Sequence, residues 1–188
     1  AGFNQEKEPY QVVTAEGIPL TGVMDLCMGD GFKLVLMADG TVLKWGTNPT
    51  PVKDIFDATL ENITQISCGD DTACARKEDG TAYCFGGKAK QIHADLFSTP
   101  FENIRSITVG KTHTCLITDP AGEIYCWGTH TYGELGMLFP PVTPDIPEKV
   151  EGIQGAIGIH AGAHATCAWF ESGVVRCWGA NTHGQLGL

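Results

Sequence analysis

The sequence predicts an all-β fold, a β-propeller of about four four-stranded blades. Two features of the 188 residues support this prediction. One is a unit that recurs four times along the chain. The other is a cysteine spacing that follows the register of one hairpin in each unit. Helix signals are weak throughout the chain.

An aromatic residue followed by glycine marks the end of each unit. These pairs are Trp45-Gly46, Phe85-Gly86, Trp127-Gly128 and Trp178-Gly179, spaced 40, 42 and 51 residues apart. A further glycine precedes each pair by about 16 residues, at Gly29, Gly69, Gly110 and Gly162, and a glycine-containing turn lies between the two. Each unit therefore reads as strand, glycine, strand, tight turn and strand, and this period indicates propeller blades.

The strands of each unit follow in a fixed order. The first strands are rich in β-branched residues and read VMDLCMG, ITQISCG, IRSITVG and GAIGIHAG. The second strand precedes the turn, and the third ends at the aromatic-glycine pair. A fourth strand is expected after prolines, as in PYQVV at 9–13 and PEKV at 147–150. The expected blades span roughly 9–50, 51–99, 100–143 and 144–188 of a single propeller or propeller fragment, 1–188.

The cysteines test this interpretation independently. A three-residue turn at 78–80 places Lys77 opposite Thr81, and therefore Cys74 opposite Cys84. The turn of the third unit is one residue longer, and so is its cysteine spacing. Opposed positions on antiparallel strands lie within disulfide reach. The predicted disulfides are Cys74–Cys84, Cys115–Cys126, Cys167–Cys177 and, between the first two blades, Cys27–Cys68.

Free thiols and a zinc site are the alternatives to disulfides. A zinc site would need CxxC-type clusters with convergent ligands, and no cysteine pair has that spacing. Disulfides are therefore favoured, and neither a metal nor a cofactor is expected. Disulfides imply an oxidising compartment, so the expected location is secreted or extracellular, or periplasmic.

The stretch GKTHTCLITDPAGEIYCWGTHTYGELG at 110–136 resembles the repeat of the regulator-of-chromosome-condensation family. GANTHGQLG at 179–187 is the nearest match to the family's loop, whereas GTNPTP and GGKAKQ lack its tail. The resemblance implies a propeller that typically has seven blades. The cysteine-bearing variety is similar to secreted bacterial repeat proteins and to extracellular regions of plant receptor kinases.

Four units are too few for a seven-bladed ring. Three arrangements remain: a fragment of a longer chain, two copies that complete one ring, and a closed four-bladed ring. The first two are favoured jointly. An open half-propeller would leave apolar faces bare on its first and last blades.

The charge of the chain bears on its partners. The net charge is −10 with only 12 lysines and arginines, so nucleic acid is not an expected partner. No apolar run approaches the roughly 20 residues of a membrane span, so membrane insertion is not expected. The expected partner is another protein, with a homodimer or a longer chain as the alternative ways of completing the fold.

No catalytic motif is present, and the chain is not expected to be an enzyme. His113 occupies the family's His-Thr position, where it is expected to satisfy a backbone group. His160 and His164 bracket a strand glycine, but a metal pair there would need a third ligand.

The favoured function is an extracellular protein-binding module, such as a ligand-binding ectodomain or a secreted inhibitor. Aromatic side chains, methionines and loop histidines on a rim are the candidate contacts: His130, Tyr132, Trp169, Phe170, His183 and Met37. The alternative, implied by the founding member of the family, is a guanine-nucleotide exchange regulator of a small GTPase. The disulfides and the negative charge oppose this alternative, and an uncharacterised enzyme ranks third.

Overall fold

The computed structural model describes residues 12–14, 16–30, 32–45, 49–53, 57–86, 90–92, 99–141, 143 and 145–187. These residues form four antiparallel sheets, here called the first to fourth sheets in chain order. In each sheet the strands are neighbours in the order in which they occur in the sequence. The described residues contain no helix, and hence none that could cross a membrane. The predicted all-β propeller fold is confirmed.

The strand bounds follow the predicted units. The first sheet contains β1 (Val23–Met28), β2 (Lys33–Met37), β3 (Val42–Trp45) and β4 (Pro49–Pro51). The second contains β5 (Ile63–Cys68), β6 (Ala73–Lys77), β7 (Ala82–Phe85) and β8 (Lys90–Gln91). The third contains β9 (Ile104–Val109), β10 (His113–Thr118), β11 (Ile124–Gly128) and β12 (Glu148–Lys149). The fourth contains β13 (Ala156–Ala161), β14 (Ala165–Phe170) and β15 (Val175–Gly179).

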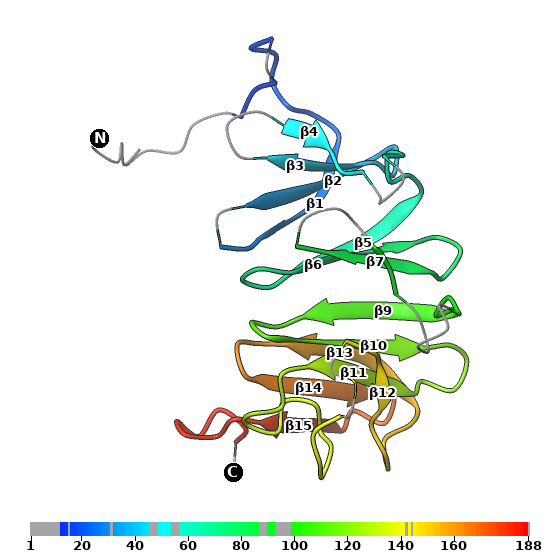
Figure 1. Ribbon diagram of the computed structural model, residues 1–188, viewed down its shortest axis with the longest axis vertical. Helices are drawn as coiled ribbons and strands as arrows, with labels where there is room; N and C mark the ends of the chain where they lie inside the picture. The colour runs from blue at the N-terminus through cyan, green and yellow to red at the C-terminus, as the bar shows by residue number, and fades with distance from the viewer. Residues whose placement is uncertain are drawn as a thin grey trace.

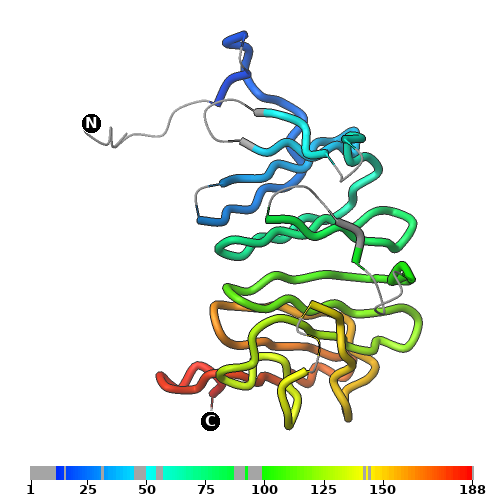
Figure 2. The backbone as a smooth tube through the Cα atoms, in the orientation of Figure 1, coloured from blue at the N-terminus to red at the C-terminus, as the bar shows by residue number. Residues whose placement is uncertain are grey.

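The sheets are stacked face to face along the chain (Figure 1). β5 packs on β1 and β2, β9 on β5 and β6, and β13 on β9 and β10. The first sheet lies at one end of the stack and β15 of the fourth sheet at the other, so the stack does not close on itself (Figures 1 and 2). The closed four-bladed ring considered above is therefore wrong for this chain.

The hairpin register is the one that the cysteine spacing predicts. Cys74 lies opposite Cys84, Cys115 opposite Cys126 and Cys167 opposite Cys177, with Cα–Cα distances of 4.1 Å. Each of these pairs forms a disulfide within one sheet. A fourth disulfide joins Cys27 to Cys68 and so ties the first sheet to the second. No cysteine is free.

The fourth strands differ from the expected assignment. The PEKV segment supplies β12, which pairs with β11 and so completes the third sheet, not the fourth. The expected boundary between 143 and 144 therefore divides the strands of one sheet. The reason is that each fourth strand follows the loop after the aromatic-glycine pair, as β4 and β8 also do. PYQVV at 9–13 precedes the first sheet, and its residues 9–11 lie outside the described part of the chain.

The core is divided among the three seams between adjacent sheets. Each seam has its own cluster of buried side chains, built around aliphatic residues of the first strand of the following sheet: Ile63 and Ile66, Ile104 and Ile107, and Ile159. These side chains pack on second-strand and third-strand residues of the preceding sheet. Because neither sheet of a pair has a core of its own, burial depends on the neighbouring sheet.

A column of glycines allows the sheets to approach closely where the first strands end. A Cβ atom on Gly69 would lie 1.9 Å from the carbonyl oxygen of Gly110, and one on Gly110 would lie 2.4 Å from that of Gly162. Gly29 meets Gly69 in the same way, at 2.5 Å. Any side chain at these positions would therefore collide with the next sheet.

Candidate functional site

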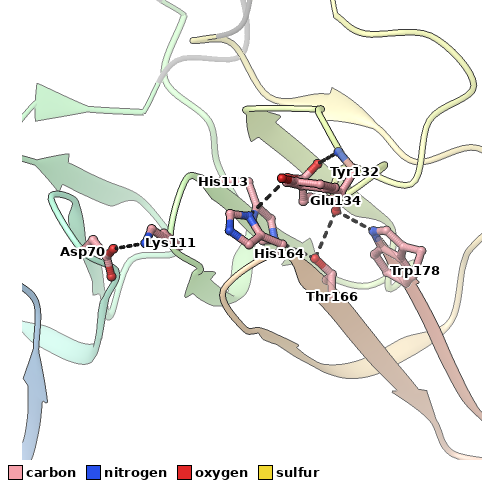
Figure 3. A network of polar contacts seen from close by, with 8 residues as sticks. All are labelled: Asp70, Lys111, His113, Tyr132, Glu134, His164, Thr166 and Trp178. Carbon is pink, nitrogen blue, oxygen red and sulfur yellow. Dashed lines mark hydrogen bonds and ion pairs between the residues drawn. The ribbon is translucent and has the colours of Figure 1, made fainter. Parts of the chain in front are cut away.

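A network of polar contacts surrounds the loop 128–136, which leaves the third sheet and packs against the fourth (Figure 3). Gly128 has a φ of 107°, a conformation that favours glycine and turns the chain sharply at the end of β11. Thr129 then donates its backbone N–H to the carbonyl of Thr112, at 2.9 Å. The loop is thus anchored to its own sheet before it reaches the next one.

Glu134 fixes the loop from inside. Its side chain is fully buried, and Oε2 accepts a 2.8 Å hydrogen bond from the backbone N–H of Tyr132. Its backbone carbonyl accepts hydrogen bonds from Trp178 Nε1 at 2.8 Å and from Thr166 Oγ1 at 3.1 Å. Both donors belong to the fourth sheet, so this one residue joins the two sheets.

His113 extends the network into the seam. Thr166 donates its hydroxyl hydrogen to Glu134, so it must accept the 2.8 Å hydrogen bond from His113 Nε2. His113 is almost fully buried, and this burial lowers the pKa of its imidazole below the ordinary value of 6.5. The ring therefore favours the neutral form. It bonds a side-chain hydroxyl, not the backbone group expected from the sequence.

Tyr132 is held at the surface of this network. Its ring packs on that of His164, with centroids 5.0 Å apart and planes tilted by 54°. His164 Nδ1 lies 3.5 Å from Glu134 Oε1, close enough for an ion pair when the imidazole is protonated but without hydrogen-bond geometry. The Tyr132 side chain remains 51% exposed. A half-exposed aromatic ring is thus presented in a fixed orientation.

The side of the stack on which the loop 128–136 lies, here called the loop side, also carries an ion pair between sheets. Lys111 Nζ lies 3.2 Å from Asp70 Oδ2, and both side chains are half exposed (Figure 3). The two residues directly follow the column glycines Gly110 and Gly69. Such an exposed pair contributes little to stability, about 0–1 kcal/mol, but it gives the loop side of the stack both signs of charge.

The structure separates the six candidate contact residues into two groups. His130, Tyr132 and His183 lie in loops after the third strands, on the loop side of the stack, where the glycine column also lies. Met37, Trp169 and Phe170 lie beside the hairpin turns at the opposite ends of the strands. Antiparallel pairing requires this separation, because the loop after a third strand and the turn before it lie at opposite ends.

The hairpin-turn group is also less available. Phe170 packs against the core of the third seam, with Arg176 over its ring. Trp169 covers Gly158, where a Cβ atom would lie 1.8 Å from the indole. His183 is exposed in its loop, and Met37 is partly buried.

Two strongly exposed residues escaped the sequence analysis. Leu138 is 93% exposed and Phe139 is 78% exposed. They follow the loop 128–136 after one intervening residue, Met137, in the longer connection that leads to β12. The signal was available in the spacing, since the third interval between aromatic-glycine pairs is 51 residues whereas the others are 40 and 42.

The chemistry of this site is that of positioning. A carboxylate that solvent does not reach, such as that of Glu134, cannot act on a substrate in solution. Among the described residues, no group of three His, Cys, Asp or Glu side chains is placed to hold a metal ion. What the geometry presents outward is Tyr132, followed by Leu138 and Phe139.

Comparison with known repeats identifies the units. The regulator of chromosome condensation (RCC1) repeat matches residues 63–87, 104–134 and 121–169. The mouse (Mus musculus) serine/threonine-protein kinase Nek9 is 26% identical over 147 residues, which cover 67% of this chain and 14% of the kinase. RCC1 domain-containing protein 1 of the same species is 32% identical over 91 residues, covering 47% of this chain and 24% of that protein. The chain thus spans a small part of each relative.

Solved structures share the fold at low identity. Human WBSCR16 has a TM-score of 0.73 at 20% identity, covering 88% of this chain and 49% of its own. Prp20p of Saccharomyces cerevisiae has a TM-score of 0.67 at 20% identity, covering 88% and 46%. The ectodomain of the Physcomitrella patens receptor kinase CR4 has a TM-score of 0.58 at 22% identity, covering 87% and 43%. Repeat matches, relatives and fold agree that the chain contains regulator of chromosome condensation (RCC1) repeats, over residues 63–87 and 104–169.

Proposed function

We propose that the chain is a non-enzymatic protein-binding module, and that the connection between β11 and β12 is its contact surface. The observation that carries this proposal is the exposure of three large apolar side chains in that connection: Tyr132, Leu138 and Phe139. Exposed apolar patches mark interaction sites, and aromatic side chains are enriched among the residues that form the buried centre of interfaces.

The fixed backbone under Tyr132 supports the same function. Binding costs less conformational entropy when the contact side chain is already held in place. The Glu134 carboxylate and the His164 ring hold Tyr132 in this way, through the 2.8 Å hydrogen bond to its N–H and the packing of the two rings. The partner is a protein surface of mixed polarity, because the loop side of the stack also carries Lys111 and Asp70.

The proposed location is extracellular or another oxidising compartment. All eight cysteines are paired in disulfides, and such pairing persists where glutathione and thioredoxin do not reduce it. Intact mass of the natural protein before and after reduction tests this point, since each disulfide adds two hydrogens when it is reduced. A fully reduced natural protein would contradict the proposed location.

A second candidate function is regulation of a small GTPase, as the family resemblance implies. The fold match with Prp20p, a protein with binding properties to Gsp1p and histones, favours it. Nucleotide exchange on a small GTPase in the presence of the chain measures this activity directly. A catalysed exchange rate would replace the binding module as the favoured function.

Photo-crosslinking tests the contact surface. A photoreactive phenylalanine at position 132 should capture a partner from the compartment in which the protein resides. Tyr132→Ala combined with Phe139→Ala should reduce binding of the captured partner by about 1,000-fold, since two hot-spot residues that each contribute about 2 kcal/mol together contribute about 4 kcal/mol.

The opposite side of the stack, where the hairpin turns lie, supplies the control. Trp169 is 43% exposed, and Trp169→Ala changes an aromatic residue beside the hairpin turns. Binding that survives this change but not the changes at 132 and 139 supports the proposed surface. The reverse pattern would place the contact surface at the hairpin turns.

A further inference from the structure

We propose that Asn62 carries an N-linked glycan, attached on the side of the stack away from the contact surface. The sequence Asn62-Ile63-Thr64 is an acceptor site for this modification, because its middle residue is not proline and a threonine stands two positions after the asparagine. The inference rests on the proposed extracellular location, and it narrows the oxidising compartment to the secretory pathway of a eukaryotic cell.

The modification is the transfer of an oligosaccharide to the side-chain amide of Asn62. The co-substrate is a lipid-linked oligosaccharide pyrophosphate. The amide nitrogen Nδ2 attacks the anomeric carbon of the first sugar, the bond between this carbon and the pyrophosphate oxygen breaks, and the amide releases one proton. The products are a glycosylated asparagine and the lipid pyrophosphate, so no oxidant or reductant is consumed.

Both functional groups of the acceptor site are exposed. Asn62 directly precedes β5, and its side chain and that of Thr64 lie at the surface, whereas Ile63 between them is buried in the first seam. The alternation of side chains along a strand produces this pattern. No residue in the described part of the chain forms a hydrogen bond with the Asn62 side chain. A glycan at this position is therefore compatible with the folded seam.

The backbone at Asn62 forms a tight turn between two sheets. Its φ is 57°, a left-handed conformation in which asparagine is enriched. Its carbonyl accepts the backbone N–H of Glu78 in the second sheet at 2.9 Å. Ile63 donates its N–H to the carbonyl of Gly40 in the first sheet, also at 2.9 Å. These bonds fix the main chain and do not use the side-chain amide.

An asparagine in this turn also has a structural role, which its equivalent in the next sheet isolates. Asn103 directly precedes β9, with the same φ of 57°, and its carbonyl accepts the N–H of Asp119 at 2.8 Å. Arg105 stands two positions later, so Asn103 is not an acceptor site. The feature that distinguishes Asn62 is therefore Thr64, and the chain contains a matched control.

Thr64 makes a structural contact as well. Its Oγ1 accepts a 2.7 Å hydrogen bond from Arg76 Nη1, and Arg76 Nε donates to the carbonyl of Ile104 in the third sheet. Thr64→Ser keeps the hydroxyl, and so keeps both this contact and the acceptor site. Asn62→Asp removes the acceptor amide but introduces a residue that also tolerates the left-handed conformation. These two changes separate the modification from the fold.

The glycan lies on the side of the stack opposite the proposed contact surface. Ile63 at the start of β5 pairs with Lys77 at the end of β6, so Asn62 lies beside the hairpin turn that follows β6. The hairpin turn of the first sheet lies there too, since a Cβ atom on Gly40 would be 3.2 Å from the Asn62 Cα atom. The loop 128–136 leaves from the other ends of the strands. The sugar therefore does not cover the loop side.

Mass spectrometry of the tryptic peptide 54–76 from the natural protein measures the modification. We expect this peptide to carry the added mass of a glycan, and a peptide N-glycosidase should remove it and leave an aspartate at position 62. Natural protein with paired cysteines but an unmodified Asn62 would overturn the proposal. A fully reduced natural protein would instead contradict the proposed location and, with it, the glycan.

Matched variants secreted from a eukaryotic cell test the two turns. Asn62→Asp should abolish the glycosidase-sensitive mass, whereas Thr64→Ser should retain it. Arg105→Thr supplies the hydroxyl that Asn103 lacks and should add a second glycan. Because the ion pair of Arg105 with Asp119 is exposed and contributes little, circular dichroism should show this variant to be folded. A mass that persists in Asn62→Asp, or a folded Arg105→Thr variant with one glycan, would contradict the proposal.

A glycan introduced on the loop side separates this inference from the proposed contact surface. Thr129→Asn creates an acceptor site with Thr131, at an exposed position three residues from Tyr132. The added glycan should prevent binding of the partner captured at position 132, whereas loss of the natural glycan in Asn62→Asp should leave binding unchanged. Binding that is lost in Asn62→Asp would overturn the placement of the natural glycan. Binding that survives the glycan at position 129 would contradict the contact surface and not the modification of Asn62.

Discussion

The loops 128–136 and 179–187 have nearly the same sequence and backbone but different surroundings. Gly128 and Gly179 both have a φ of 107°. In each loop the side chain of the residue before leucine accepts a backbone N–H two residues earlier, at 2.8 Å for Glu134 and 2.9 Å for Gln185. Glu134 and Leu135 are nevertheless fully buried, whereas Gln185 is exposed and Leu186 only partly buried.

This difference separates two levels of structure. The conformation of each loop follows from its own residues, because glycines with positive φ and one side-chain hydrogen bond occur in both. The burial of the loop comes from the next sheet, which packs on the loop after the third sheet, whereas the described residues hold no sheet beyond the fourth.

The largest expected effect on the free energy of unfolding is at Leu135 and Leu186, the equivalent leucines of the two loops. Leu135→Ala should lower the free energy of unfolding by about 2–5 kcal/mol, because it leaves a cavity in the third seam. Leu186→Ala should lower it by less than half as much, because Leu186 lines an open groove. Urea unfolding measures both values. Equal losses would show that the leucine stabilises its own loop and not the seam.

The disulfides sharpen the comparison between covered and bare sheets. Replacing both Cys115 and Cys126 by alanine should cost about 2–3 kcal/mol through the entropy of the unfolded chain. The pair Cys167 and Cys177 closes a loop of nearly equal length, with sequence separations of 10 and 11 residues, so its entropic contribution is the same.

Any excess cost at the third sheet therefore measures packing. Cys115 and Cys126 are fully buried, while Cys167 and Cys177 are only partly buried. Unfolding of the two double-alanine variants in urea gives the difference. A larger loss in the fourth sheet would be incompatible with this account.

Replacing Glu134 and Gln185, the equivalent hydrogen-bond acceptors of the two loops, has a smaller expected effect on the free energy of unfolding. Glu134→Ala should cost about 1–3 kcal/mol, because it leaves the Tyr132 N–H without its acceptor in a partly buried site. Gln185→Ala should cost under about 1 kcal/mol, because water can replace the lost bond in the exposed loop. Glu134→Gln is the conservative control and should retain most of the stability, since an amide oxygen can accept the same bond. A full loss in this control would show that the carboxylate charge stabilises the seam.

The sequence was sufficient to predict the strands, the hairpin register and the cysteine pairs. These are local properties: the turn length between Lys77 and Thr81 determines which residues lie opposite each other. The sheet to which a two-residue strand such as β12 belongs is not local, because its own residues favour neither neighbour. The PEKV segment was therefore assigned to the wrong side of a boundary.

The candidate site was predicted less completely. Tyr132 was identified as a contact residue by its type and its loop, and that role remains a prediction. The support from Glu134 and His164 required three-dimensional information, because they come from different sheets. The 51-residue interval after Trp127 indicates a longer connection, but Leu138 and Phe139 were missed because an exposed apolar pair within it has no periodic pattern that distinguishes it from a core segment.

The smallest expected effect is the pH dependence that His113 contributes, and it also tests the cover supplied by the fourth sheet. Burial holds the pKa of His113 below 6.5 in the folded chain, while the unfolded chain has an ordinary histidine. As the pH falls through about 6.5, the unfolded state takes up a proton that the folded state does not. The contribution to stability is therefore complete above this pH and is lost progressively toward the folded pKa. His113→Gln keeps a donor for Thr166 but does not titrate, so its midpoint of urea unfolding should fall less than that of the parent between pH 7.5 and pH 5. Equal falls in the two proteins would show that the seam does not shield this ring from protons.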